Sequence, residues 1–264
     1  MKEWKVICAG VCVLGLAVGA GASSAEDETP APAIDPRATE LVTAMARTLA
    51  SLKAARVATE YTVDVVLETG QKIQYGGAST TWLRRPNALR TERAGERAST
   101  FFVYDGTQVT LYAQPQNFYA TREAPGTLDA LLDYALERLD VTPAGVDLLY
   151  SDGGMGLLDG VTSGTYVGAA MIAGRRCHHV AFRAPDVDWQ LWIEAGERPL
   201  PCRYVITTLD VERTPEMAVT YRDWDTEPEL SDGLFTFTAP EGAKRIVFGE
   251  PEERAAEATE EGSE

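Results

Sequence analysis

The chain has 264 residues, 45% of them hydrophobic, and a formal net charge of −16 at pH 7. This acidity excludes a nucleic-acid-binding role, because a phosphate backbone requires a basic surface and the sequence has no run of Lys or Arg. The length suffices for one sizeable core, so we expect one globular domain over residues 35–248.

The first 25 residues are typical of a secretory signal peptide. Lys2 and Lys5 precede an apolar run over residues 6–21, and small residues follow up to Ala25. The run is short and rich in Gly and Ala for a membrane span, which needs ~20 apolar residues. An uncleaved membrane anchor is the alternative. Without Lys2, Glu3 and Lys5 the net charge of the exported chain is −17.

We therefore predict export to the periplasm, no lipid anchor and a mature N-terminus between Ser23 and Glu26. N-terminal sequencing of the exported protein checks this prediction. An intact Met1 on a soluble form of the protein would contradict it.

Residues 26–34 are a proline-containing linker, and an amphipathic helix follows it. Asp35 is a suitable N-cap, Pro36 suits the first helical position, and the helix is expected to end near Lys53. Its apolar stripe consists of Leu41, Met45, Leu49 and Leu52.

The hydrophobic period then changes from 3.6 to 2, which predicts strands. Residues 57–67 alternate between an apolar and a polar face, and Thr69–Gly70 turns the chain into a second strand over residues 72–83. Gly76 and Gly77 interrupt this second strand, and we expect a bulge or a sharp bend there.

Residues 81–121 predict a meander of short antiparallel strands. Pro86–Asn87 separates the strand that ends at Leu83 from one that begins at Leu89. Asp105–Gly106 is a strong hairpin signal between strands 101–104 and 109–112, and residues 114–117 form the next turn before strand 118–121.

Helices are expected next. Thr127 is a suitable cap for an amphipathic helix over residues 128–139, and a further helical turn covers residues 144–150. The glycines of Ser151–Gly154 indicate a flexible loop. The helices either form a lid over a cavity or are a static layer that covers the sheet.

The second half is rich in strands. They are expected over residues 165–172, 176–183, 189–193, 202–211 and 217–224, with an edge strand at 246–248 that closes the sheet. Residues 249–264 contain seven Glu and one Arg, which predicts a disordered acidic tail.

Two cysteines, Cys177 and Cys202, follow the signal peptide. An oxidising compartment favours a disulfide between them. However, if strands 176–183, 189–193 and 202–211 are consecutive, the first and third lie ~10 Å apart, beyond the reach of a disulfide. We therefore predict two free thiols, and the disulfide stays as the alternative.

No catalytic or cofactor motif is present in the sequence, so we expect neither an enzyme nor a cofactor. The only histidines, His178 and His179, are adjacent on one strand and therefore point to opposite faces. No spacing of a histidine with nearby Asp residues marks a metal site, and no pair of carboxylates marks an acid–base site.

Aromatic and aliphatic residues on the alternating strands predict one apolar face of a large curved sheet, which two short helices fill only in part. An unfilled apolar concavity is a ligand site. We expect this cavity to be lined by Tyr61, Val63, Tyr75, Trp82, Arg85, Phe102, Tyr104, Leu111, Leu131, Leu132, Trp189 and Trp192.

Two resemblances follow from motifs. The order RRPN, YDGTQVTLY and LFTFTAPEGA resembles the periplasmic lipoprotein carriers LolA and LolB, whereas GQKIQYGG, GTLDALLD, LLYSD, CHHVAF and DVDWQLWI resemble a family of predicted periplasmic proteins (domain of unknown function 2092). The resemblance implies an α+β fold: a strongly curved antiparallel sheet, or half-open β-barrel, with an N-terminal helix and short helices on its concave side.

The carrier resemblance also implies that Arg85 lies near the cavity and helps to hold the lid. The strand after it, ALRTER, departs from the aromatic-rich version in the carriers, so lipoprotein need not be the cargo. The alternative for Arg84, Arg85, Arg90 and Arg93 is a solvated strand face whose arginines pair with Glu92 and Glu96.

The resulting interpretation is a monomeric, non-enzymatic periplasmic carrier or binding protein for a hydrophobic or amphiphilic small molecule or lipid. The first alternative is a sensor or interaction module on the same fold that binds an envelope protein. The second is an enzyme with an unrecognised site.

Overall fold

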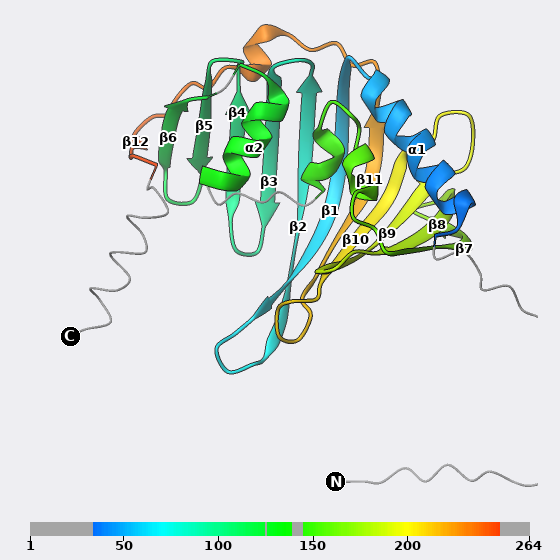
Figure 1. Cartoon of the computed structure of the whole chain (residues 1–264). Coiled ribbons are helices and arrows are strands. Elements are labelled where there is room, and N and C mark those ends of the chain that lie inside the picture. Colours follow the sequence, from blue (N-terminus) through cyan, green and yellow to red (C-terminus); the bar gives the residue numbers. More distant parts are fainter. Residues whose placement is uncertain (1–33, 125, 139–144, 249–264) are drawn as a thin grey trace, which may run out of the picture. The chain divides into compact units, whose positions relative to one another are not determined.

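A computed structural model describes residues 34–124, 126–138 and 145–248 of the chain (Figure 1). The predicted signal peptide, the acidic tail and, except for Ile34, the predicted linker lie outside these residues.

Twelve strands form one sheet. The strands are β1 (Ala54–Val66), β2 (Lys72–Arg84), β3 (Ala88–Gly95), β4 (Ser99–Tyr104), β5 (Gln108–Ala113), β6 (Phe118–Glu123), β7 (Ser163–Ile172), β8 (Arg175–Arg183), β9 (Val187–Glu194), β10 (Pro201–Thr208), β11 (Glu216–Asp225) and β12 (Lys244–Arg245). The helices are α1 (Pro36–Ser51), α2 (Leu128–Arg138) and the 3-10 helices η1 (Val146–Leu149), η2 (Met155–Leu158) and η3 (Asp232–Phe235).

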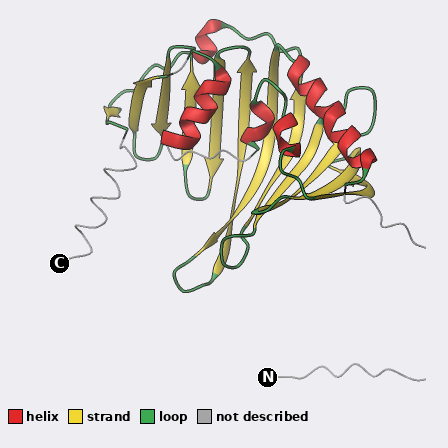
Figure 2. Ribbon diagram, in the orientation of Figure 1, coloured by secondary structure: helices red, strands yellow, loops and turns green. Residues whose placement is uncertain are grey.

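The strand order is β12-β6-β5-β4-β3-β2-β1-β11-β10-β9-β8-β7. All neighbours are antiparallel except β12 and β6, and β1 joins the two meanders because it pairs with both β2 and β11. Helices α1, α2, η1 and η2 lie against the concave side of the curved sheet (Figure 2). The α+β half-barrel expected from the sequence is confirmed.

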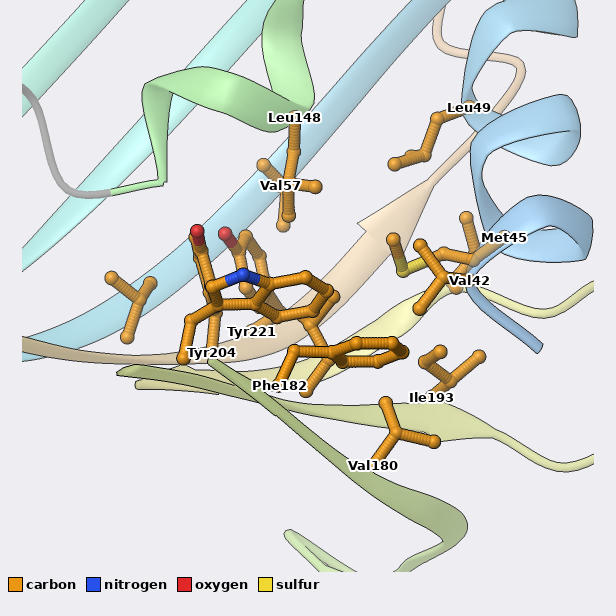
Figure 3. Close-up of a cluster of buried hydrophobic side chains, with 14 of the residues drawn as sticks. Val42, Met45, Leu49, Val57, Leu148, Val180, Phe182, Ile193, Tyr204 and Tyr221 are labelled. Atoms are coloured by element: carbon orange, nitrogen blue, oxygen red, sulfur yellow. The ribbon is translucent and has the colours of Figure 1, made fainter. Parts of the chain in front are cut away.

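Helix α1 begins where the sequence predicts. The Asp35 side chain accepts a hydrogen bond from the N–H of Arg37 at 2.8 Å, and Pro36 takes the first helical position. The helix buries Val42, Met45 and Leu49 against β8, β9 and β10, where Val180, Phe182, Leu191, Ile193 and Tyr204 complete a core cluster (Figure 3).

Helix α2 covers the other half of the sheet. The Thr127 hydroxyl accepts a hydrogen bond from the N–H of Ala130 at 3.3 Å, which confirms Thr127 as its cap. Leu128 and Leu131 pack in a second core cluster with Leu89, Tyr104 and Val109. In the described part of the chain, no helix is both long enough and apolar enough to cross a membrane.

The first meander forms through the predicted turns. Asp105 accepts hydrogen bonds from the N–H groups of Thr107 and Gln108, each at 2.9 Å, and Gly106 has a φ of +96° that a side chain would disfavour. The turn between β2 and β3 contains a cis peptide bond before Pro86. Strands β2 to β6 therefore pair in sequence order.

Of the bulge or sharp bend expected at Gly76 and Gly77, the bulge is absent. The β1–β2 pairing continues through both residues without a register shift. Instead, a Cβ on Gly77 would lie 2.3 Å from the Tyr61 hydroxyl, and a Cβ on Gly95 would lie equally close to it. The glycines are needed because the Tyr61 side chain lies directly over the backbone of β2 and β3.

The expectation for Ser151–Gly154 is also corrected. Gly153 and Gly154 are buried, and a Cβ on Gly153 would lie 2.1 Å from the carbonyl oxygen of Ala46 in α1. Gly153 also has a φ of +70°. The segment is therefore a tight connection packed on a helix, and glycine is present because it permits this close approach.

Cys177 and Cys202 form a disulfide, so the prediction of two free thiols is wrong. The strand order behind that prediction is correct, since β9 lies between β8 and β10. However, Cys177 pairs with Glu194, the last residue of β9, and the register of β10 shifts at Cys202. The two Cα atoms are 6.8 Å apart, because the disulfide spans β9 at its last residue, where β10 has a bulge at Cys202.

The C-terminal segment differs from the sequence expectation. The edge strand is Lys244–Arg245 rather than residues 246–248, and it lies beside β6, so the sheet stays open between β12 and β7. Before it, η3 is held by two arginines. Arg84 pairs with Asp232 at 2.7 Å, and Arg90 donates to the Leu234 carbonyl at 3.1 Å.

Candidate ligand cavity

A cavity of about 510 Å³ lies on the concave face, where it takes its lining from both core clusters. The floor comes from Val57, Thr59, Tyr61 and Val63 of β1, Ser79 and Thr81 of β2, Leu89, Thr91 and Arg93 of β3, Thr100 and Phe102 of β4, Leu111 of β5, and Met217, Tyr221 and Trp224 of β11. The cover comes from Leu132 and Ala135 of α2 and from Gly145, Val146, Leu148 and Leu149.

The strand register gives the cavity a covered end and an open end. Leu89 and Val57 lie beside the covering residues, whereas the half-buried Val63 and the exposed Arg93 lie further along β1 and β3, toward the hairpin tips. Figure 1 shows that the helices cover the upper part of these strands and leave the part near the β3–β4 hairpin uncovered.

Four hydroxyl groups in the floor form two hydrogen-bonded pairs. Thr59 and Ser79 share a hydrogen bond of 2.7 Å, and Thr81 and Thr91 share one of 3.1 Å. Each of these bonds uses one donor and one acceptor of its pair, so these hydroxyls demand less of a ligand than lone hydroxyls would. Most of the other lining residues are aliphatic or aromatic, so the lining as a whole is mainly apolar.

Tyr61 supports an arginine at the open end. Arg93 Nε donates to the Tyr61 hydroxyl at 2.5 Å, and the guanidinium lies 4.6 Å from the centre of the Tyr61 ring. The arginine thus contacts the ring face as a cation–π pair. The alternative of a solvated strand face paired with Glu92 and Glu96 is met only in part. Arg90 pairs with Glu92 at 2.6 Å, but its side chain is largely buried and also donates to the Leu234 carbonyl, whereas Arg93 pairs with neither glutamate.

A half-buried acid, Asp147, lies behind the covered end. The Tyr204 hydroxyl donates to Asp147 of η1 at 3.4 Å, and burial raises the pKa of Asp147 above its usual value. Burial, together with the nearby Asp147 carboxylate, also raises the pKa of Tyr204 and of Tyr221. The Tyr221 hydroxyl, which has no hydrogen-bond partner among the described residues, lies close to Gly145 at the cavity wall.

Arg85 connects the sheet to the cover. Its Nη2 donates to the carbonyl oxygen of Tyr150 at 2.8 Å, just after η1. Burial lowers the pKa of Arg85, and the carboxylates of Asp129 and Asp152 oppose that shift. Asp129 in turn accepts a hydrogen bond from the N–H of Ser151 at 2.9 Å. These contacts link the β2–β3 turn, the start of α2 and the end of η1.

The structure brings together only part of the predicted cavity set. Five of the predicted residues line the cavity: Tyr61, Val63, Phe102, Leu111 and Leu132. Tyr104, Leu131 and Trp189 are buried in the two core clusters instead. Arg85 lies at the β2–β3 turn, and Tyr75 lies on β2 with Arg97 5.2 Å from its ring centre.

Trp82 and Trp192 lie on the opposite face, which corrects their placement. Trp82 directly follows the cavity residue Thr81 on β2, so its side chain points away from the cavity. Its ring lies near Arg56 and Arg90. Trp192 lies between the core residues Leu191 and Ile193 and stacks on His179, with ring centres 4.0 Å apart.

Sequence reasoning missed the small and polar lining residues. Thr59, Ser79, Thr81 and Thr91 are not aromatic, so a search for rings does not mark them, although the pleat alternation places Thr59 on the same face as Tyr61. The lining residues of β11, which reach the cavity through the β1–β11 pairing, could not be identified before that pairing was known.

The two histidines point to opposite faces, as predicted. His178 Nδ1 lies 3.1 Å from the Tyr166 hydroxyl, whereas His179 Nε2 lies 3.0 Å from Gln190 Oε1. Burial lowers the pKa of His179. Within residues 34–124, 126–138 and 145–248, no group of three or more His, Cys, Asp or Glu side chains is arranged to hold a metal ion.

Three comparisons relate the chain to known proteins. The family model described as "Predicted periplasmic protein (DUF2092)" matches residues 38–249. A search of curated proteins found no match. Similar solved structures include an uncharacterized conserved protein from Thermus thermophilus, at 11% identity and a TM-score of 0.46, where the match covers 80% of this chain and 99% of that one.

Two further structures are similar over most of their length. LprF from Mycobacterium bovis has 14% identity and a TM-score of 0.42, with 80% of this chain and 99% of that chain covered. A LolA superfamily protein from Nitrosomonas europaea has 9% identity and a TM-score of 0.37, with 76% of this chain and 97% of that chain covered.

Proposed function

Since the chain belongs to the DUF2092 family of predicted periplasmic proteins, we propose that it acts in the periplasm as a non-enzymatic binding or carrier protein. Its ligand is a hydrophobic or amphiphilic molecule whose acyl chain occupies the concave cavity. The observation that carries the proposal is the cavity of about 510 Å³, which has a mainly apolar lining and one open end.

The size and chemistry of the cavity support an acyl chain. Small-molecule sites usually measure about 300–1,000 Å³ and are lined mainly by apolar side chains. Burying one CH₂ group contributes about 0.8 kcal/mol. A chain of ten such groups would therefore gain roughly 8 kcal/mol before the costs of association, without any specific polar contact.

The cover supports reversible loading. Leu132, Leu148 and Leu149 are the main apolar contacts that it makes with the cavity. Arg85 holds it at one end through the Tyr150 carbonyl. If this contact acts as a tether, Arg85 helps to hold the lid, which is the role that the carrier resemblance implied. The ligand then enters at the end of the cover that is not tied to the sheet.

Blocking the floor is the direct test. Replacing Thr91 with Trp puts an indole into the cavity, because Thr91 points inward from β3. We expect the affinity of the delipidated T91W protein for Nile red and for 1-dodecanol to fall at least about tenfold, equivalent to about 1.4 kcal/mol. Fluorescence titration of Nile red, followed by its displacement with 1-dodecanol, measures both affinities.

Ala94→Trp is the matched control. Ala94 is exposed on the same strand, and the alternation of β3 places its side chain on the other face. A94W should bind both compounds as the wild type does. The proposal fails if the delipidated wild type shows no saturable binding, or if T91W binds as tightly as A94W.

A second candidate, docking of an envelope protein, is favoured by the edge strand β7. None of the residues Ser163–Ile172 is charged, and beyond the bridge of Gly164 to Ile34 the residues Val167 and Met171 are 53% and 65% exposed. An uncharged open edge can accept an added strand from a partner.

Replacing Val167 with Lys should abolish capture of such a partner and leave Nile red binding unchanged. T91W should weaken Nile red binding and leave capture of the partner unchanged.

A further inference from the structure

One charged side chain stands out in the cavity. Among the described residues that line it, Arg93 alone carries a charge, and it lies at the open end. The other lining residues of β3, Leu89 and Thr91, are uncharged and lie deeper. About 13 Å of β3 separates Leu89 from Arg93 at the usual rise of a strand. A chain that lies along β3 would thus end beside the guanidinium.

The guanidinium is held in place but not neutralised. Tyr61 accepts a hydrogen bond from its Nε and contacts it with the ring face. Gly77 and Gly95 leave the space that the Tyr61 ring occupies, so the support is built into two strands. Among the described residues Arg93 has no ion-pair partner, whereas Arg90 and Arg222 pair with Glu92 and Glu60.

We infer that Arg93 binds the anionic head group, a carboxylate or a phosphate, of the amphiphile whose chain fills the cavity. The inference rests on the proposed function and narrows its ligand class. The guanidinium fork matches two oxygens of either group, and a charge-assisted hydrogen bond is about twice as strong as a neutral one. With Nε engaged by Tyr61, the two terminal nitrogens are the donors directed at the head group.

The net charge of −16 does not prevent this. At physiological ionic strength the Debye length is about 8 Å, so most of the carboxylates on the surface are screened from the cavity mouth. The nearest acidic side chains along the same hairpin have other partners. Glu96 accepts from the N–H of Gly76 at 2.9 Å, and Glu92 pairs with Arg90 on the other face.

The test compares ligands that share a chain and differ in head group. Dodecanoate, dodecyl phosphate and 1-dodecanol displace Nile red from the delipidated full-length protein. We expect Arg93→Gln to weaken dodecanoate or dodecyl phosphate about tenfold, while 1-dodecanol and Nile red keep their wild-type affinities. Arg93→Lys should retain part of the preference, because it keeps the charge and loses the fork.

Arg222→Gln is the control, since Arg222 is an arginine of the sheet that pairs with Glu60 on the other face. It should change none of the four affinities. The anion that loses more affinity in R93Q identifies the head group as carboxylate or phosphate. Equal affinity of wild type and R93Q for both anions, or a parallel loss of 1-dodecanol, overturns the inference and leaves the proposed function standing. No binding of any of the four compounds to the wild type rejects both.

Discussion

Replacing Leu131 with Ala is expected to lower the free energy of unfolding by about 4 kcal/mol. Leu131 is fully buried in the cluster of Leu89, Tyr104 and Val109, so its removal leaves a new void in a packed core. Denaturant unfolding, monitored by tryptophan fluorescence, measures the change. The affinity of the folded fraction for Nile red should stay the same, because Leu131 does not line the cavity.

Leu132→Ala is the matched variant one residue away. Leu132 is also buried, but it already faces the cavity, so its removal enlarges an existing space. We expect a smaller loss of stability, about 2 kcal/mol, and a weaker affinity for Nile red. Equal losses of stability at the two positions, with unchanged Nile red binding, would mean that α2 only covers the core and that Nile red binds outside the cavity.

Removal of the disulfide should also have a large effect. The double variant C177A/C202A is expected to lose about 3 kcal/mol of unfolding free energy, because the bridge closes a loop with a sequence separation of 25 residues. Both cysteines are fully buried, and alanine leaves no polar group unpaired there. Denaturant unfolding of the oxidised wild type and of the variant gives the difference.

Two controls separate the bridge from the packing of the cysteines. The unfolded, unreduced wild type should have no free thiol and a mass two units below that of the reduced protein. Wild type held in reductant should unfold like the double variant. Stability that is independent of reductant would show that the bridge adds nothing and that the loss in the variant comes from missing side-chain volume.

The local elements could be predicted because local chemistry determines them. Asp35 and Pro36 define the start of α1 through a cap and a fixed φ, and Asp105–Gly106 defines the β4–β5 hairpin. The strands followed from their period of two residues, and their order in each meander followed from short turns. The pairing of β1 with β11 is long-range and had no such signal.

The errors share a physical origin in contacts between distant segments. The sequence neighbours of Gly77 and Gly153 indicate a bulge and a flexible loop, but contacts with Tyr61 and Ala46 explain these glycines. The prediction of free thiols used the spacing of a flat sheet, which does not apply at the end of β9 where β10 has a bulge. Arg90 and Arg93 lie on opposite faces of β3, and it is the contact of Arg93 with the distant Tyr61 that distinguishes the two arginines.

The connection between β6 and β7, residues 124–162, contains every residue of the cavity cover. None of the strands that form the floor lies in this connection, and these strands pair only with other strands of the sheet. The cover is therefore a single contiguous stretch of the gene. An exchange of this stretch between family members therefore leaves the strand pairing in place. Under the proposed function, such chimeras should differ in which apolar chains they accept, while the head-group preference stays with Arg93 on the floor.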